Sequence, residues 1–272
     1  MSSGPVGIAT AAEKIRRALE KGRPGGHTAL PGGEVVLRIA YTRTAVREPP
    51  PGALRRQGVL AGEARHPVAD AFRVLRARLL AELDARGGGM VAVTAAGPAE
   101  GKTFVATNLA VAIASLFTRT ALLVDLDLRR PVVHRRFGLA PKQGLADCLL
   151  GRAALEDCLV NPGIERLVLL PQPEPLTGGA SELLASPRMA ALARELRGRY
   201  PDRVVILNTP PLLAGDDALT ASALADGCLL VAREGRTSRA SLLRAAELIG
   251  RERLLGSVLD DARWSGSPAY GY

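Results

Sequence analysis

Aromatic residues make up only 3% of this 272-residue chain, so its core must be built from aliphatic side chains. Lysine is almost as scarce, since only Lys14, Lys21, Lys102 and Lys142 accompany 32 arginines among the 36 basic residues. Arginine excess in a chain rich in alanine and leucine is typical of GC-rich coding sequence. The net charge of +9 is therefore poor evidence for DNA binding, and we expect no specific nucleic-acid partner. The hydrophobic content of 47% excludes wholesale disorder.

Cysteine is also rare. Cys148, Cys158 and Cys228 show no C-x-x-C spacing, which argues against a disulfide framework or a zinc site and fits a reducing compartment. The start of the chain has no secretory leader pattern, and the longest uncharged stretch, residues 103–118, is shorter than the ~20 residues a spanning helix needs. We expect a cytoplasmic protein, located peripherally at the inner face of the plasma membrane only where a partner recruits it.

Positive charge is concentrated near the N-terminus. Residues 1–86 hold 15 Lys/Arg against 8 Asp/Glu, a net charge of +7, whereas residues 87–272 hold 21 against 19, a net charge of +2. An anionic membrane surface would attract such a segment, although a solvated arginine-rich surface explains the pattern equally well.

Composition divides the chain into three parts. We predict a basic N-terminal extension over residues 1–57, a compact domain over 58–263 and a flexible tyrosine-containing tail over 264–272. The extension is expected to hold an amphipathic helix over 8–21, a Gly/Pro linker over 22–33 and one strand over 34–42.

Inside the domain, short apolar runs alternate with helical patterns. Strands are predicted at residues 90–95, 120–125, 203–207, 227–231 and 255–259, and helices at 66–85, 102–117, 186–198 and 238–250. Continuous apolar strands separated by helices predict an α/β fold, with a mostly parallel twisted sheet covered by helices on both faces.

A phosphate-binding loop follows the first of these strands. The segment Ala96-Gly97-Pro98-Ala99-Glu100-Gly101-Lys102-Thr103 lies between a strand and a helix, the context that such a loop requires. Backbone N–H groups would surround the phosphates, Lys102 would contribute positive charge and Thr103 would bind Mg²⁺. Ala96 replaces the first glycine of the usual pattern, and a chance Gly-Lys-Thr is the alternative. The predicted nucleotide-binding residues are Gly97, Pro98, Ala99, Glu100, Gly101, Lys102, Thr103 and Phe104.

Two carboxylates follow the strand at 120–125. Because ligands bind at the carboxyl ends of parallel strands, Asp125 is expected beside the phosphate loop, and strand alternation would place Asp127 on the same side. Both would suit Mg²⁺ coordination and deprotonation of an attacking hydroxyl, whereas a solvated loop start is the alternative.

The strand at 203–207 ends in Asn208, where a carboxylate usually holds Mg²⁺ through water. An amide accepts a hydrogen bond from a metal-bound water but brings no negative charge. We therefore expect weaker Mg²⁺ binding and slower turnover, without loss of ATP binding.

These motifs, in this order, resemble the bacterial tyrosine autokinases of capsule and exopolysaccharide loci (BY-kinases), P-loop NTPases with deviant Walker motifs and a MinD/ParA-like fold. The resemblance covers about residues 58–272 and is nearest to the branch found beside exosortase loci. It is carried by the phosphate loop, by Asp125-Leu126-Asp127-Leu128-Arg129-Arg130-Pro131, by Thr209-Pro210-Pro211, by Gly144-Leu145-Ala146-Asp147 and by Asp70-x-x-Arg73-x-x-Arg76.

The resemblance implies a set of roles. Lys102, Asp125 and Asp127 would be catalytic, and Thr103, Asp125 and Asn208 would hold Mg²⁺. Asp70, Arg73 and Arg76 would contact another subunit of a homo-oligomer. Tyr270 and Tyr272 would accept phosphate from ATP in trans. Asp260 stands where relatives usually have an adenine-binding asparagine, so it would accept the exocyclic amine but leave a ring nitrogen unpaired.

The leading interpretation is an ATP-dependent protein-tyrosine autokinase that regulates polysaccharide polymerisation and export and docks on a membrane chain-length regulator. A catalytically weakened ATP-binding switch on the same scaffold is the second. A partitioning ATPase of the ParA/MinD type is the third, although residues 95–100 lack the lysine typical of that class.

Overall fold

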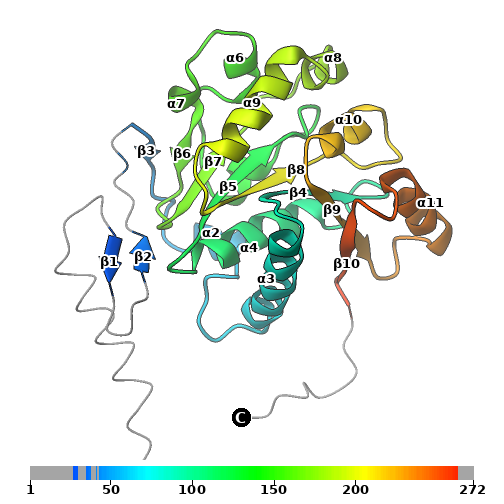
Figure 1. Cartoon of the computed structure of the whole chain (residues 1–272), viewed down its shortest axis with the longest axis horizontal. Coiled ribbons are helices and arrows are strands. Elements are labelled where there is room, and N and C mark those ends of the chain that lie inside the picture. The colour runs from blue at the N-terminus through cyan, green and yellow to red at the C-terminus, as the bar shows by residue number, and fades with distance from the viewer. Residues whose placement is uncertain (1–26, 30–34, 38–40, 42, 263–272) are drawn as a thin grey trace, which may run out of the picture.

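The computed structural model of the protein describes residues 27–29, 35–37, 41 and 43–262 (Figure 1). The predicted helix over residues 8–21 and the tail with Tyr270 and Tyr272 lie outside these ranges. Within them, no helix combines the length and apolarity needed to cross a bilayer.

An eight-stranded sheet forms the centre of the molecule, in the order β10-β9-β4-β8-β5-β7-β6-β3. Its neighbouring strands are parallel, apart from the antiparallel pair β6–β7. The strands are β3 (Ala45–Val46), β4 (Met90–Ala95), β5 (Thr120–Asp125), β6 (Val160–Asn161), β7 (Leu167–Leu170), β8 (Arg203–Asn208), β9 (Gly227–Arg233) and β10 (Leu254–Asp260). A separate antiparallel pair joins β1 (His27–Ala29) to β2 (Val35–Leu37).

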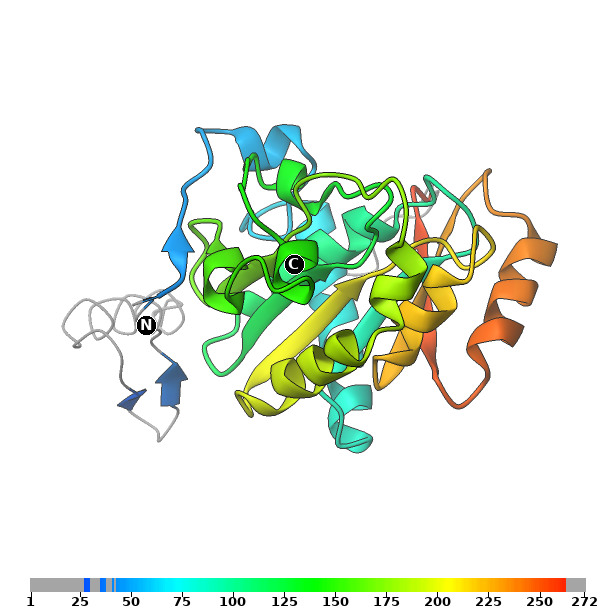
Figure 2. The same ribbon diagram turned by 90° about the horizontal axis from the view of Figure 1, so that it is seen from above.

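Helices cover both faces of this sheet, as the alternation of strands and helices predicts (Figures 1 and 2). One face carries α2 (Ala53–Arg56), α3 (Pro67–Ala85), α4 (Lys102–Ala114) and α5 (Val133–Arg136). The other carries α6 (Leu145–Leu149), α7 (Leu155–Cys158), α8 (Ala180–Leu184), α9 (Pro187–Gly198), α10 (Asp217–Ala223) and α11 (Arg239–Ile249).

Each central strand serves two cores, which is why its sequence is apolar throughout. In β4, Val91 and Val93 pack in the core beneath α3 and α4, whereas Met90 and Ala92 pack in the core beneath α9 and α10. Successive side chains of a strand point to opposite faces, so a strand buried on both sides shows no polar alternation. All six residues of β4 are buried, and so are all six of β5.

Helix starts lie where the sequence predicts them. The ring of His66 accepts a hydrogen bond from Val68 N over 3.2 Å before Pro67 opens α3, and Ser186 Oγ accepts one from Met189 N over 3.1 Å before α9. Such side-chain caps satisfy N–H groups that have no partner within the helix.

Helix α4 ends at Ala114, three residues before the predicted end at residue 117. Its last turn is closed from outside, because the Arg76 guanidinium donates to the carbonyl of Ala112 over 2.8 Å and to Ser115 Oγ over 2.9 Å. Ser115 Oγ itself donates to the Ala112 carbonyl over 2.7 Å. A side chain of α3, far away in the sequence, therefore satisfies a carbonyl in the last turn of α4.

The folded unit begins before the predicted boundary at residue 58. Strand β3 pairs with β6, and the buried Ala53 anchors α2. Asn108 on α4 then fixes the entering chain: its Oδ1 accepts from Leu60 N over 2.7 Å and from Ala61 N over 2.9 Å, and its Nδ2 donates to the Gly58 carbonyl over 2.8 Å. The predicted linker over residues 22–33 also differs, since it contains β1.

Candidate functional site

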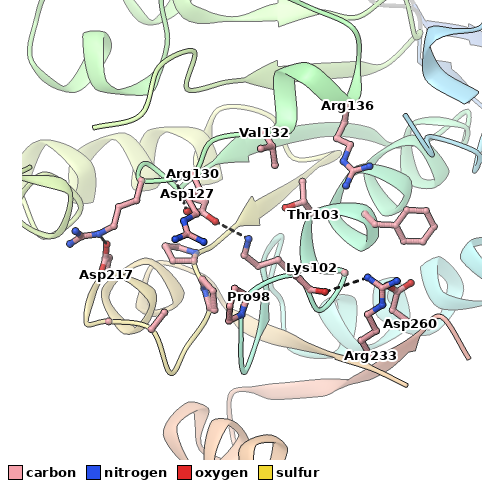
Figure 3. Close-up of a pocket in the computed structure, with 18 of the residues that line it drawn as sticks. Pro98, Lys102, Thr103, Asp127, Arg130, Val132, Arg136, Asp217, Arg233 and Asp260 are labelled. Atoms are coloured by element: carbon pink, nitrogen blue, oxygen red, sulfur yellow. Dashed lines mark hydrogen bonds and ion pairs between the residues drawn. The ribbon is translucent and has the colours of Figure 1, made fainter. Parts of the chain in front are cut away.

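A cavity of about 790 Å³ lies at the carboxyl ends of the parallel strands, the position at which open α/β sheets bind ligands (Figure 3). The chain reaches it from the loop after β4, the segment after β5, the segment after β8 and the ends of β9 and β10. The residues lining it are Pro98, Ala99, Gly101, Lys102, Thr103, Phe104, Asp127, Arg129, Arg130, Val132, Arg136, Pro210, Pro211, Ala214, Gly215, Asp217, Arg233, Asp260 and Asp261.

The phosphate loop forms one wall of this cavity. Gly101 caps α4 in the left-handed conformation, with φ of 90°, and a β-carbon there would collide with Oδ2 of Asp260. The first N–H groups of α4 have no carbonyl partner within the helix, and the helix dipole adds partial positive charge at this end. Lys102 and Thr103 begin α4 at the cavity wall, and their binding of phosphate and Mg²⁺ stays a prediction.

Two predicted loop residues brace the loop instead of lining the cavity. Glu100 is buried, and its Oε2 accepts a hydrogen bond from Gly97 N over 2.9 Å. A carboxylate that bonds to its own loop holds the turn in shape. Gly97 and Glu100 therefore support the loop, whereas Pro98, Ala99, Lys102 and their neighbours face the cavity.

Lys102 pairs with Asp127 across the cavity, with 2.8 Å between Nζ and Oδ2. Only 12% of the lysine side chain and 6% of the aspartate side chain are exposed, so the pair is largely shielded from water. Asp127 Oδ1 also accepts from Arg130 N over 3.2 Å. Of the two predicted carboxylates, Asp127 is the one that lines the cavity.

Asp125 lies one layer deeper and is fully buried. Its Oδ1 accepts from Asn208 Nδ2 over 2.8 Å and from Asp127 N over 3.3 Å, and its Oδ2 accepts from the backbone N–H groups of Val132 and Val133, each over 3.1 Å. Burial raises the pKa of Asp125 to about 6, and the hydrogen bond from Asn208 works in the opposite direction. Asp125 thus ties the segment after β5 to the strand end.

Asn208 pairs directly with Asp125 in the register between β5 and β8. Its Nδ2 serves Asp125, while its Oδ1 is buried without a hydrogen-bond partner. An unpaired buried acceptor is costly and suits a donor that the chain itself does not supply. A water molecule bound to a metal would be such a donor.

The residues present fit Mg²⁺ only as a site shared with a phosphate group. Thr103 and Asp127 contribute oxygen ligands to the cavity wall, and Mg²⁺ prefers one or two protein oxygens completed by water and phosphate. Across the described ranges, no cluster of three or more His, Cys, Asp or Glu side chains forms a self-sufficient metal site.

Arginines surround the rest of the cavity, and the sequence alone did not single out all of them. Arg129 bonds to Asp217 over 2.5 Å, and Arg130 lies beside Asp127 (Figure 3). Arg136 and Arg233 were not predicted to belong to this site. Arg233 ends β9, so its place at a strand end was the available signal, whereas Arg136 reaches the cavity from α5.

The predicted subunit-contact residues lie on α3, away from the cavity lining. Asp70 and Arg73 form an ion pair on this helix. Arg76 is half-buried and already engaged with the end of α4. Its role in the chain's own packing is therefore clear, whereas a role in subunit contact stays a prediction.

Comparison with known proteins identifies the family. No family model matches the chain. Tyrosine-protein kinase YwqD of Bacillus subtilis is 36% identical over 184 residues, which is 67% of this chain and 76% of YwqD. The chain belongs to the bacterial tyrosine-protein kinases. The resemblance carried by the sequence motifs is thereby confirmed.

Other bacterial tyrosine kinases and their relatives agree. The succinoglycan biosynthesis transport protein ExoP of Rhizobium meliloti is 35% identical over 181 residues, which is 63% of this chain but only 22% of ExoP. The kinase domain of the Escherichia coli tyrosine kinase ETK superposes with a TM-score of 0.67 and 30% identity, over 79% of this chain and 84% of that domain.

The MinD-like fold is confirmed as well. The septum site-determining protein MinD of Pyrococcus horikoshii, solved with Mg-ADP, matches with a TM-score of 0.54 over 62% of this chain and 69% of MinD. Its identity is 22%, so this likeness shows the fold alone. The kinase domain of ETK, at 30% identity, is similar to this chain in sequence as well as in fold.

Proposed function

We propose that this chain transfers the γ-phosphoryl group of a Mg²⁺-bound purine nucleoside triphosphate to protein tyrosine, ATP being the donor that the family resemblance implies. The observation that carries this proposal is the Lys102–Asp127 pair at the start of α4, which puts a cation, a carboxylate and free backbone N–H groups into one cavity. Its polysaccharide context, polymerisation and export, is supported by relatives such as ExoP.

The cavity supports a division of labour among its charged groups. Lys102 and the N–H groups of α4 bind the transferred phosphates, and Arg130 offsets charge that develops on them. Bound Mg²⁺ neutralises phosphate charge, with Thr103 and Asp127 as its protein oxygens. Lys102 leaves Asp127 for the phosphate, which frees an Asp127 oxygen.

Asp127 is the proposed acceptor of the tyrosine proton, because its carboxylate faces the cavity. Asp125 has a supporting role, because it accepts three hydrogen bonds from backbone N–H groups after β5, in the segment that carries Asp127, and a fourth from Asn208 on β8. The family resemblance implies that both carboxylates are catalytic and that Asp125 is a Mg²⁺ ligand, whereas we propose that Asp127 meets the substrate and that Asp125 acts through it.

The tyrosine substrates we propose are Tyr270 and Tyr272 on the tail of a neighbouring subunit in a homo-oligomer. We also propose that a membrane chain-length regulator docks on the domain and holds it at the cytoplasmic face of the membrane. Relatives named for polysaccharide transport support this context. Asp70 and Arg73 on the exposed side of α3 remain the candidate subunit contact.

A second function is favoured by one observation. Asn208 places an amide where a carboxylate would strengthen Mg²⁺ binding, so the same scaffold would serve as a nucleotide-binding switch with little turnover. Both functions require nucleotide binding at Lys102, and only the first requires phosphotyrosine.

Transfer of radiolabel from [γ-³²P]ATP and Mg²⁺ to the full chain separates the two. We expect phosphotyrosine in the wild type, none in Lys102→Ala and none in the double variant Tyr270→Phe, Tyr272→Phe. The exposed Lys142, changed to alanine, is the matched control and should retain labelling. Nucleotide binding without phosphotyrosine, even with the membrane partner present, would establish the switch and reject the kinase.

A further inference from the structure

Strand β10 delivers a carboxylate to the end of the cavity opposite Asp127. Its last residue, Asp260, lines the cavity beside Gly101, and Lys102 lies between the two acidic groups (Figure 3). If the phosphates of a nucleotide lie at Lys102 and Asp127, the base extends toward Asp260. This placement rests on the proposed nucleotide site.

The Asp260 carboxylate has acceptor capacity to spare. Among the described residues, its hydrogen-bond donor is the backbone N–H of Asp261. The neighbouring Arg233 is committed elsewhere, because it pairs with Asp261 over 2.9 Å and approaches the Ala99 carbonyl at 3.4 Å. Partial burial raises the pKa of Asp260, which indicates a carboxylate stripped of part of its water. Hydrogen-bond donors on a ligand would replace the lost water and stabilise this carboxylate.

An ionised carboxylate only accepts hydrogen bonds, and it has two oxygens side by side. Guanine carries two adjacent donors on its base-pairing edge, the ring N1–H and the 2-amino group. Adenine carries one donor, the 6-amino group, next to the lone pair of ring N1. A carboxylate therefore pairs with both guanine donors, whereas it faces one donor and one repelling lone pair on adenine.

The cation beside Asp260 has the matching polarity. Guanine has a carbonyl oxygen next to its N1–H, and the positive field of Arg233 at this end of the cavity favours that oxygen. Adenine would bring an amine to the same place. Both charged groups thus favour the same base.

We propose that Asp260 is a specificity-determining residue that makes this cavity bind guanine nucleotides more tightly than adenine nucleotides. An asparagine at this place offers one donor and one acceptor, a pattern that suits the edge of adenine. The change to aspartate replaces the donor with a second acceptor.

Competition binding of unlabelled diphosphates against a fluorescent N-methylanthraniloyl nucleotide tests this in the full-length protein with Mg²⁺. The wild type should bind GDP at least about tenfold more tightly than ADP, roughly 1.4 kcal/mol. Inosine diphosphate keeps N1–H but lacks the 2-amino group, so its affinity should lie between the two. GDP, ADP and inosine diphosphate carry the same ribose and phosphates, so the ratio of their dissociation constants reports the contribution of the base alone.

The variant Asp260→Asn should lose the GDP preference and gain affinity for xanthosine diphosphate, because an amide pairs with the N1–H and the adjacent C2 carbonyl of xanthine. A gain of binding cannot come from misfolding. Asp84→Asn is the matched control, since Asp84 is an exposed aspartate on α3 that bonds to Arg119 outside the cavity lining, and it should keep the GDP preference.

ADP binding as tight as GDP binding in the wild type, or a GDP:ADP ratio unchanged in Asp260→Asn, overturns this inference and leaves the proposed function intact. If neither nucleotide binds the wild type, the proposed function fails and the inference fails with it.

Discussion

The side-chain amide of Asn208 donates a 2.8 Å hydrogen bond to Oδ1 of Asp125, between residues that are direct partners in the β5–β8 register. Both side chains are fully buried. A carboxylate at position 208 would put two negative charges side by side away from water, and each would disfavour ionisation of the other. The amide of Asn208 therefore stabilises the charged form of Asp125. With a carboxylate at position 208, a cation such as Mg²⁺ would be needed to do so.

Asn208→Asp should make the stability of the protein depend on Mg²⁺. In EDTA we expect the free energy of unfolding to fall by about 1–3 kcal/mol, because one hydrogen bond is lost and two carboxylates meet. Added Mg²⁺ and nucleotide should restore it. Urea unfolding with and without Mg²⁺ measures both, and equal stability of variant and wild type in EDTA would contradict the expectation. A rise in kinase activity above about tenfold would show that the missing carboxylate limits turnover.

Asp125→Asn and Asp127→Asn should separate stability from function. Asp125 accepts four hydrogen bonds in the buried layer, so an amide there leaves backbone donors unpaired and should cost about 1–3 kcal/mol of unfolding free energy. Asp127→Asn leaves the largely shielded Lys102 without its counter-charge, so it should lower stability as well, but it should also lower the phosphorylation rate at least about a hundredfold. Thermal unfolding and single-turnover kinetics give the two readings, and a hundredfold rate loss in Asp125→Asn with the rate kept in Asp127→Asn would assign the base to Asp125.

Unfolding free energy should depend on pH through Asp125. Burial raises the pKa of Asp125 in the folded chain to about 6 from 3.8, so the folded state binds a proton more tightly than the unfolded state. Protonation of Asp125 therefore contributes its full share to the free energy of unfolding below about pH 4, and this share is lost as pH rises through about 6. The share is at most about 3 kcal/mol. Denaturant titrations at pH 4 and pH 7 should show this difference in the wild type and a smaller one in Asp125→Asn. Equal pH dependence in both proteins would rule Asp125 out as its source.

Gly101→Ala should damage the phosphate loop twice. The left-handed backbone at φ of 90° costs an L-residue about 1–2 kcal/mol, and the new methyl group meets the Asp260 carboxylate. Fluorescence titration should show nucleotide affinity falling at least about tenfold, and adding Asp260→Ala should recover part of it. Gly198→Ala is the control, because a β-carbon at this last residue of α9 meets nothing within 4 Å, so it should leave nucleotide binding unchanged and lower no stability. Full affinity in Gly101→Ala would mean that the loop tolerates another backbone.

Local sequence predicts the centre of this fold well and its margins poorly. The apolar runs of β4 and β5 are long and bounded by turns, so their predicted limits agree with the structure. The two-residue strands β3 and β6 carry no such pattern, and they form through pairing, β3 with β6 and β6 also with β7. The last turn of α4 is bonded by Arg76, a long-range contact that periodicity along α4 does not contain.

The site divides in the same way. The loop around Lys102 is encoded locally, because a strand, a glycine turn and a helix follow one another. The relative positions of Asp125 and Asp127 are not encoded locally, because β5 ends at Asp125 and the alternation of side chains along a strand no longer applies to Asp127. Arg136 joins the cavity through tertiary packing alone, which is why no local pattern indicates it.

The three hydrogen bonds of Asn108 connect the incoming chain to the helix that starts with Lys102. A displacement of residues 58–61 must either break these bonds or move α4, because both the oxygen and the nitrogen of the Asn108 amide are bonded to that segment. A movement of the chain before residue 58 would thus be transmitted through Asn108 and α4 to the phosphate loop. Ligand binding at the phosphate loop would be transmitted through the same contacts to residues 58–61.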